Sequence, residues 1–303
     1  MSTQPPEQRD PAHHPERIDL RTLAKMARAS DPFACLACYD ATTAKLCERA
    51  GVHLLLAGDS AAQVVLGFER TIDMPLDFAI HITAALRRGA PSRCIMADMP
   101  FLSYHAEETE ALKNAGRFLT EGMADIVKLE ADASFGPLVR AMTRAGIPVC
   151  AHVGLLPQAA SITGYAARGR TAADARRIVD DAIALQDAGA AMLLVEAVPD
   201  ETTEAILAST TVPLIGIGAG PACHGQILVV NDLLGMQDWK PRFVEPAADL
   251  APEITRAAAE WVRRVAARAP GGQRYRMHEG EHDRLGTPNK TRVTWEGVKP
   301  SSG

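Results

Sequence analysis

Four acidic residues of this chain stand directly behind short apolar runs, and their side chains are well suited to catalytic chemistry. They are Asp59, Asp98, Glu130 and Glu196. A single carboxylate behind a strand is often only the N-cap of the next helix. Several carboxylates in one cavity, however, repel each other unless a cation neutralises them. All-oxygen ligands suit a hard ion such as Mg²⁺, so we expect a divalent metal site if the four residues meet.

Two further residues belong to the same chemistry by position. Lys128 lies two residues before Glu130, so on a strand both side chains point the same way. A lysine within an apolar run is costly to bury unpaired, and we expect it to face the metal site and a substrate carboxylate. The alternative is an ion pair inside the fold. His152 follows another apolar run. It could be an acid, a hydrogen-bond donor to the substrate or a core histidine, and its position behind the run favours a role in the active site.

The six cysteines give a weaker signal. Cys35 and Cys38 have the spacing of a metal or redox motif, but three positions apart on a strand they point to opposite faces. The sequence has no second cysteine pair that could complete a zinc site. We therefore interpret the cysteines as reduced structural residues.

The elements that must position these residues follow a repeated pattern of strand-sized apolar runs and amphipathic stretches. Continuous apolar runs are typical of parallel strands that are buried on both faces. The expected strands are Phe33–Cys38, His53–Ala57, Cys94–Ala97, Ile126–Leu129, Pro148–Ala151, Met192–Val195, Pro213–Ile217 and Ile227–Val230. The expected helices are Ala41–Ala50, Leu76–Arg88, Ala106–Glu121, Ser134–Ala145, Thr171–Ala188, Thr202–Ser209 and Glu253–Arg268.

Eight such units predict an α/β fold, a closed (β/α)8 TIM barrel whose carboxyl strand ends meet at one mouth. Five expected helices end before a glycine, the common left-handed C-cap: Gly51, Gly89, Gly122, Gly146 and Gly189. The segment after the seventh strand is least clear and predicts only a short turn around Cys223–Gln226. A doubly wound sheet is the alternative, but Gly216–Gly220 comes late and lacks the dinucleotide-binding spacing. We interpret that cluster as a tight turn.

Composition bounds the remaining possibilities. The 303 residues are 47% hydrophobic, 5% aromatic and carry a net charge of −5, which argues against a nucleic-acid partner. No apolar run reaches the ~20 residues of a membrane span. We expect a disordered leader over residues 1–17, the barrel over 18–270 and an extension over 271–303. The leader lacks the apolar core of a signal peptide, so we expect a cytoplasmic protein.

The chain from about Thr22 to His282 resembles the ketopantoate hydroxymethyltransferase family. Eight stretches in the family's order carry the resemblance, and together they are specific. They are Tyr39-Asp40, Gly58-Asp59-Ser60, Arg87–Pro91, Ala97–Phe101, Val127–Glu130, His152–Gln158, Val195–Pro199 and Ile215–Gly220.

The resemblance implies a barrel related to the phosphoenolpyruvate mutase and isocitrate lyase superfamily. It implies that Asp59, Asp98 and Glu130 hold the metal, that Ser60 and Lys128 join Asp59 and Asp98 at the 2-oxo acid, and that a further carboxylate takes a proton. In this implied scheme the carboxylate that takes the proton, the general base, is Glu196. We add His152 to the expected substrate contacts. The implied reaction is hydroxymethyl transfer from 5,10-methylenetetrahydrofolate to 3-methyl-2-oxobutanoate in pantothenate synthesis, in a homo-oligomer that is usually a decamer.

The residues are consistent with this chemistry on their own terms. A metal that binds a 2-oxo acid polarises the keto group and favours loss of the neighbouring proton. A carboxylate base must stay off the metal, and Glu196 fits because it stands on a more distant strand than Asp59, Asp98 and Glu130.

Several positions depart from the family pattern and leave other functions open. Ala61-Ala62 replace Leu-Gly, Asp73-Met74-Pro75 replace Pro-Val-Thr, Gly164–Gly169 lacks Lys-Val-Gln, and Asn231 replaces His. One alternative is a superfamily lyase or aldolase that acts on another 2-oxo acid, although the Lys-Lys-Cys-Gly-His type motif is missing. Others are a divergent paralogue and a non-catalytic binding protein, and the retained carboxylates argue against the last.

Overall fold

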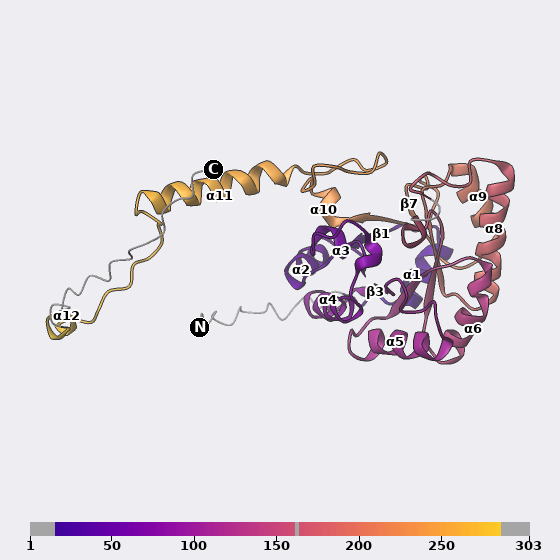
Figure 1. Cartoon of the computed structure of the whole chain (residues 1–303), viewed down its shortest axis with the longest axis horizontal. Helices are drawn as coiled ribbons and strands as arrows, with labels where there is room; N and C mark the ends of the chain where they lie inside the picture. Colours follow the sequence, from indigo (N-terminus) through magenta and orange to yellow (C-terminus); the bar gives the residue numbers. More distant parts are fainter. Residues whose placement is uncertain (1–15, 161–163, 286–303) are drawn as a thin grey trace, which may run out of the picture. The chain divides into compact units, whose positions relative to one another are not determined.

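The computed structural model describes residues 16–160 and 164–285. Eight parallel strands form a closed barrel in chain order. Figure 1 shows helices such as α4, α5, α6 and α8 around the strands. This confirms the predicted (β/α)8 fold and excludes the open sheet. The strands are β1 (Phe33–Ala37), β2 (Leu54–Ala57), β3 (Cys94–Asp98), β4 (Ile126–Glu130), β5 (Val149–Gly154), β6 (Met192–Glu196), β7 (Leu214–Ile217) and β8 (Gly225–Val229).

The longer helices around the barrel agree with the predicted helices to within a few residues. They are α2 (Ala41–Arg49), α4 (Leu76–Gly89), α5 (Glu108–Thr120), α6 (Gly136–Arg144), α8 (Ala172–Asp187) and α9 (Asp200–Ser209). The short elements are α3 (Ala61–Val64), α10 (Val230–Leu233), η1 (Thr71–Asp73), η2 (Ala133–Phe135) and η3 (Pro157–Ala159). Asp40 caps α2 by accepting the backbone N–H groups of Thr42 and Thr43, the usual role of aspartate at a helix start.

Besides the four-residue helices, one longer helix was not predicted from the sequence. Helix α1 (Leu20–Arg28) precedes β1, and Asp19 caps it by accepting the Thr22 backbone N–H at 2.8 Å. Leu23 and Ala27 on this helix are buried. The leader expected over residues 1–17 lies almost wholly outside the described residues. Of its last two residues, Arg17 lies 3.6 Å from Asp125.

Two of the five glycines that we expected to be left-handed C-caps do not adopt a left-handed conformation. Gly51, Gly146 and Gly189 adopt left-handed φ values of 86°, 80° and 106°. Gly89 is instead the last residue of α4, where an added Cβ would lie 2.3 Å from the Ala41 carbonyl oxygen. A Cβ on Gly122 would lie 2.6 Å from the Phe118 carbonyl oxygen. Close backbone approach, rather than left-handed φ, therefore explains glycine at these two positions.

The connection from β7 to β8 contains no helix among the described residues. Gly218 and Gly220 have φ values of 59° and 74°, which confirms the tight turn expected for this glycine cluster. A turn over 221–224 follows, and β8 begins at Gly225, so the expected short turn at Cys223–Gln226 starts earlier and gives way to a strand.

The register of the strands places the acidic residues beside each other. Asp98 pairs with Lys128 across β3 and β4, and Glu130 pairs with His152 across β4 and β5. All residues of β2, β3 and β4 are buried. The core lies both inside the barrel and between the barrel and its helices, so the polar residues of these strands are enclosed by apolar ones.

Residues from Pro252 onward form a second unit. The expected boundary between barrel and extension is 270/271. Helix α11 (Leu250–Ala266) spans the division and α12 (Glu281–Arg284) follows. Residues 286–303 of the expected extension lie outside the described residues. None of the helices that the structure describes is both long and apolar enough for a membrane span.

Candidate active site

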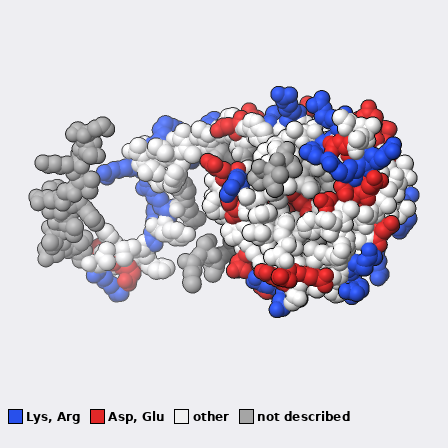
Figure 2. All heavy atoms as spheres, turned by 45° about the vertical axis from the view of Figure 1, so that its right-hand side comes forward, with Lys and Arg blue, Asp and Glu red and all other residues white. Residues whose placement is uncertain are grey.

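The four predicted carboxylates converge at the carboxyl ends of the strands. Asp98, Glu130 and Glu196 are the last residues of β3, β4 and β6, and Asp59 follows β2. Asp59, Asp98 and Glu130 are buried, and the Glu196 side chain is 17% exposed. The prediction that residues distant in sequence meet at one mouth is therefore confirmed. In Figure 2 acidic and basic side chains are interspersed on the visible face of the molecule.

Lys128 is the cation within this cluster. Its Nζ lies 2.8 Å from Asp98 Oδ1 and 3.3 Å from His152 Nδ1. The other Asp98 oxygen, Oδ2, accepts the Asp59 backbone N–H at 3.1 Å. The ion pair inside the barrel, kept as an alternative above, thus exists, whereas the expected contact of Lys128 with a substrate carboxylate stays a prediction.

His152 links Lys128 to Glu196. Lysine can only donate, so Nδ1 of His152 must accept from Lys128 and the ring proton belongs on Nε2. Nε2 lies 3.4 Å from Glu196 Oε2. Burial and the Lys128 charge lower the pKa of His152 well below its usual value, so the ring is neutral. Nε2 is buried and makes no hydrogen bond within the described residues.

Fully ionised, the four carboxylates would carry more negative charge than Lys128 can balance, and the pKa values of three of them are raised. Burial, with Asp98 as the second cause, raises the pKa of Asp59 to about 7. Burial raises the pKa of Glu196 to about 8. Burial and the Asp59 charge also raise the pKa of Glu130. A buried set of carboxylates with one lysine is therefore electrostatically prepared for a further cation.

A metal ion fits the donor set of this cluster. In residues 16–160 and 164–285 no three His, Cys, Asp or Glu side chains form a ready ligand group. Mg²⁺, however, commonly uses only one or two carboxylates and completes its shell with water and substrate oxygens. Asp98 Oδ1 is buried and, within the described residues, has no hydrogen bond beside its ion pair. These carboxylate oxygens match the hard-ion chemistry expected from the sequence.

Two buried residues at this site had no assigned role in the sequence analysis. The only sequence signal for Gln158 was its place in the family stretch His152–Gln158. No sequence signal pointed to Tyr104. The Gln158 side chain donates to Asp59 Oδ2 at 2.9 Å, and its backbone N–H donates to Glu130 Oε2 at 2.8 Å. Tyr104 Oη donates to Gln158 Oε1 at 2.9 Å.

Ser60 occupies the N-cap position of the short helix α3. Its Oγ lies 2.7 Å from Tyr39 Oη. Burial raises the pKa of Tyr39, and the negative charges of Asp59 and Asp232 raise it further. The Tyr39 hydroxyl therefore stays protonated.

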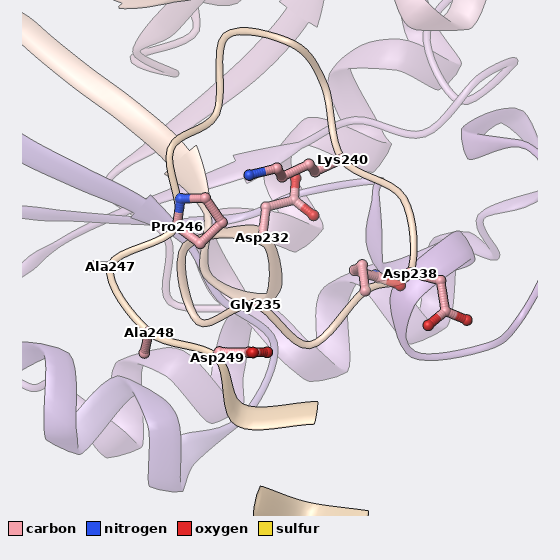
Figure 3. Close-up of a pocket in the computed structure, with 9 residues that line it drawn as sticks. Asp232, Gly235, Asp238, Lys240, Pro246, Ala247, Ala248 and Asp249 are labelled. Carbon is pink, nitrogen blue, oxygen red and sulfur yellow. The ribbon is translucent and has the colours of Figure 1, made fainter. Parts of the chain in front are cut away.

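A cavity of about 480 Å³ lies beside the end of β8. Figure 3 shows Asp232, on α10, and residues of the loop that follows, among them Lys240 and Asp249. The four carboxylates of the cluster do not line it.

The six cysteines are all free and buried, which agrees with a structural interpretation.

Comparisons with known proteins agree with this architecture. The solved structures with a similar fold include 2,3-dimethylmalate lyase, a phosphoenolpyruvate mutase/isocitrate lyase superfamily member. It is 16% identical with a TM-score of 0.56, and the match covers 90% of this chain and 94% of that one. Phosphonopyruvate hydrolase in complex with oxalate and Mg²⁺ is 17% identical with a TM-score of 0.54, with 82% and 86% covered. These similarities concern the fold alone.

Sequence relatives are much closer. The 3-methyl-2-oxobutanoate hydroxymethyltransferase of Geobacillus kaustophilus is 43% identical over 79% of this chain and 87% of its own length. That of Moorella thermoacetica is 44% identical over 82% and 92%. That of Hyperthermus butylicus is 40% identical over 89% and 94%.

The sequence pattern of one family extends over nearly the whole described barrel. That family is described as ketopantoate hydroxymethyltransferase, and the match covers residues 17–271. The chain belongs to the ketopantoate hydroxymethyltransferase family and is a transferase enzyme.

Proposed function

We propose that this protein transfers a hydroxymethyl group from 5,10-methylenetetrahydrofolate to 3-methyl-2-oxobutanoate in pantothenate synthesis, with a divalent metal such as Mg²⁺. The relatives named 3-methyl-2-oxobutanoate hydroxymethyltransferase support the reaction. The observation that carries the metal requirement is the surplus of buried carboxylates around Lys128. One solved neighbour with this fold, phosphonopyruvate hydrolase, was crystallised with oxalate and Mg²⁺, which supports the same choice of ion.

Asp59, Asp98 and Glu130 would hold the metal. When bound, the ion would polarise the keto oxygen of the 2-oxo acid and make the C3 hydrogen more acidic. Lys128 supplies the positive charge for the substrate carboxylate, because Asp98 and His152 fix its Nζ at the mouth. Ser60, held by Tyr39, contributes a hydroxyl to the same substrate.

Glu196 is the proposed base that removes the C3 proton of the 2-oxo acid. It stands on β6, away from Asp59, Asp98 and Glu130, so its carboxylate is free of the metal in this proposal. His152 Nε2 lies 3.4 Å from Glu196 Oε2 without a hydrogen bond among the described residues, so a small movement of either side chain would let it donate to the carboxylate. Carbon C3 then forms a bond to the one-carbon unit of the folate, and water supplies the hydroxyl oxygen as both bonds from this carbon to the folate nitrogens break. The two nitrogens take up the proton from C3 and one proton from water, so tetrahydrofolate leaves.

An exchange experiment tests the proposal. The protein is incubated with Mg²⁺ and 3-methyl-2-oxobutanoate in D₂O, and deuterium at C3 is followed by NMR with and without tetrahydrofolate. We expect exchange that EDTA abolishes, and product with 5,10-methylenetetrahydrofolate. Exchange without transfer would favour the lyase or aldolase alternative. Light scattering checks the homo-oligomer that we also propose from the family resemblance.

A further inference from the structure

Gln158 ties together groups from three strand ends. Its side-chain Nε2 donates to Asp59 Oδ2 at 2.9 Å and to the backbone oxygen of Met99 at 3.1 Å. Its backbone N–H donates to Glu130 Oε2 at 2.8 Å. Asp59, Met99 and Glu130 stand at the ends of β2, β3 and β4. Gln158 is 5% exposed, so these bonds are made away from bulk water.

Chemistry fixes the orientation of the Gln158 amide. Both partners of Nε2 are acceptors, a carboxylate and a carbonyl, so the nitrogen must face them. Oε1 then faces Tyr104, whose hydroxyl donates to it at 2.9 Å. The same hydroxyl accepts the Glu130 backbone N–H at 3.1 Å. Tyr104 is 3% exposed and braces both Gln158 and Glu130.

We propose that Gln158, braced by Tyr104, is a positioning residue that sets the orientation of the Asp59 and Glu130 carboxylates for the divalent cation. The inference rests on the metal requirement proposed above. Each carboxylate has one oxygen held by Gln158, and a held oxygen prevents rotation of the group. Hydrogen-bond partners behind metal ligands typically contribute 10- to 100-fold in metal affinity or activity.

A structural role alone would also make Gln158 costly to remove, so the test needs a matched control. Asn114 on α5 is buried, and its Nδ2 donates to the Ser103 carbonyl oxygen at 2.8 Å. This amide braces the loop after β3, as Gln158 does through Met99. Among the described contacts it does not touch a carboxylate of the cluster.

The experiment measures Mn²⁺ binding without substrate, by the electron paramagnetic resonance signal of the free ion, together with the melting temperature. Gln158→Met and Asn114→Leu each replace a buried amide by an apolar side chain of similar size. We expect both variants to melt at lower temperature. Only Gln158→Met should bind Mn²⁺ more weakly, by about 10- to 100-fold.

Tyr104→Phe removes one oxygen and is a second, milder test of the same proposal. It can be measured even if Gln158→Met does not fold. We expect about tenfold weaker Mn²⁺ binding, at the lower end of the range. Because Tyr104 acts partly through Gln158, the double variant should bind more tightly than the product of the two single losses indicates.

The outcomes separate the two proposals. Wild-type protein that does not bind Mn²⁺ overturns the metal site itself. Wild-type protein that binds, with unchanged affinity in Tyr104→Phe or in a folded Gln158→Met, overturns only the positioning role. An equal loss in Asn114→Leu shows that the effect is general destabilisation and also overturns it.

Discussion

The two ends of the barrel differ in how their acidic side chains are paired with cations. At the amino ends of the strands each of two carboxylates has arginine partners. Asp125, just before β4, pairs with Arg87 and Arg17, and Glu48 pairs with Arg93. At the carboxyl ends, the described residues offer Asp59, Asp98, Glu130 and Glu196 one buried cation, Lys128.

This difference separates stability from chemistry. Arg87 also donates to the backbone oxygens of Pro91, Arg93 and Met123, so the paired end joins α4 to β3 and β4. Among the described residues the acidic end buries more carboxylates than cations, which costs folding free energy and which natural proteins tolerate where function requires it. Substitutions at the mouth should therefore damage chemistry, and substitutions at the opposite end should damage stability.

The largest effect is expected from Asp59→Ala or Asp98→Ala. Each removes a proposed metal ligand, so Mg²⁺ binding and turnover should both be abolished while the barrel stays folded. Calorimetric titration with Mg²⁺ and circular dichroism check the two halves of this statement. Full activity of the wild-type protein after EDTA dialysis would refute the metal hypothesis.

Glu196→Gln should have the next largest effect. The amide keeps the shape and removes the basicity, so C3 exchange should fall by roughly 10²–10⁴-fold while Mg²⁺ and the 2-oxo acid still bind. Deuterium exchange by NMR and calorimetric titration measure these quantities. If the variant exchanges deuterium at the wild-type rate, the base is another group, with His152 as the next candidate. If the variant instead loses metal affinity, Glu196 is a metal ligand.

Arg87→Met tests the paired end. The substitution leaves Asp125, whose side chain is only 18% exposed, without its closer arginine, and it removes the three bonds to backbone oxygens. We expect a loss of about 2–4 kcal/mol in unfolding free energy, with kcat per folded molecule unchanged. Urea unfolding and activity assays check this. A stable variant with reduced kcat would mean that the two ends are not independent.

The smallest effect should follow removal of residues 1–17. The described contact that is lost is Arg17 with Asp125, and the Arg17 side chain is 69% exposed. Exposed pairs contribute about 0–1 kcal/mol, so a chain that starts at Ile18 should keep its melting temperature and activity. A decrease of several degrees would show that this segment packs on the protein.

Sequence reasoning succeeded where one local signal was enough. Most residues of the strands are buried, so largely apolar runs marked all eight strands, and the carboxylates directly behind four of the runs, or one residue farther on, marked the mouth. The convergence of Asp59, Asp98, Glu130 and Glu196 followed from barrel geometry alone.

It failed where the reason for a residue lies in a distant contact. Gln158 and Tyr104 carry ordinary polar side chains, and only the fold brings them to Asp59 and Glu130. Gly89 looked like a left-handed cap, but it accommodates the backbone of Ala41 at the start of α2. The spacing of residues along the chain contains neither kind of information.

Strand β4 shows how narrowly such a site tolerates changes in chain length. Lys128 and Glu130 alternate with Val127 and Leu129, and all four are buried. A one-residue insertion before Lys128 would exchange the two sets, placing the charges among the helices and the apolar side chains at the mouth. Substitutions can accumulate gradually on this strand, but insertions and deletions cannot, so evolution should alter this enzyme's length in its loops.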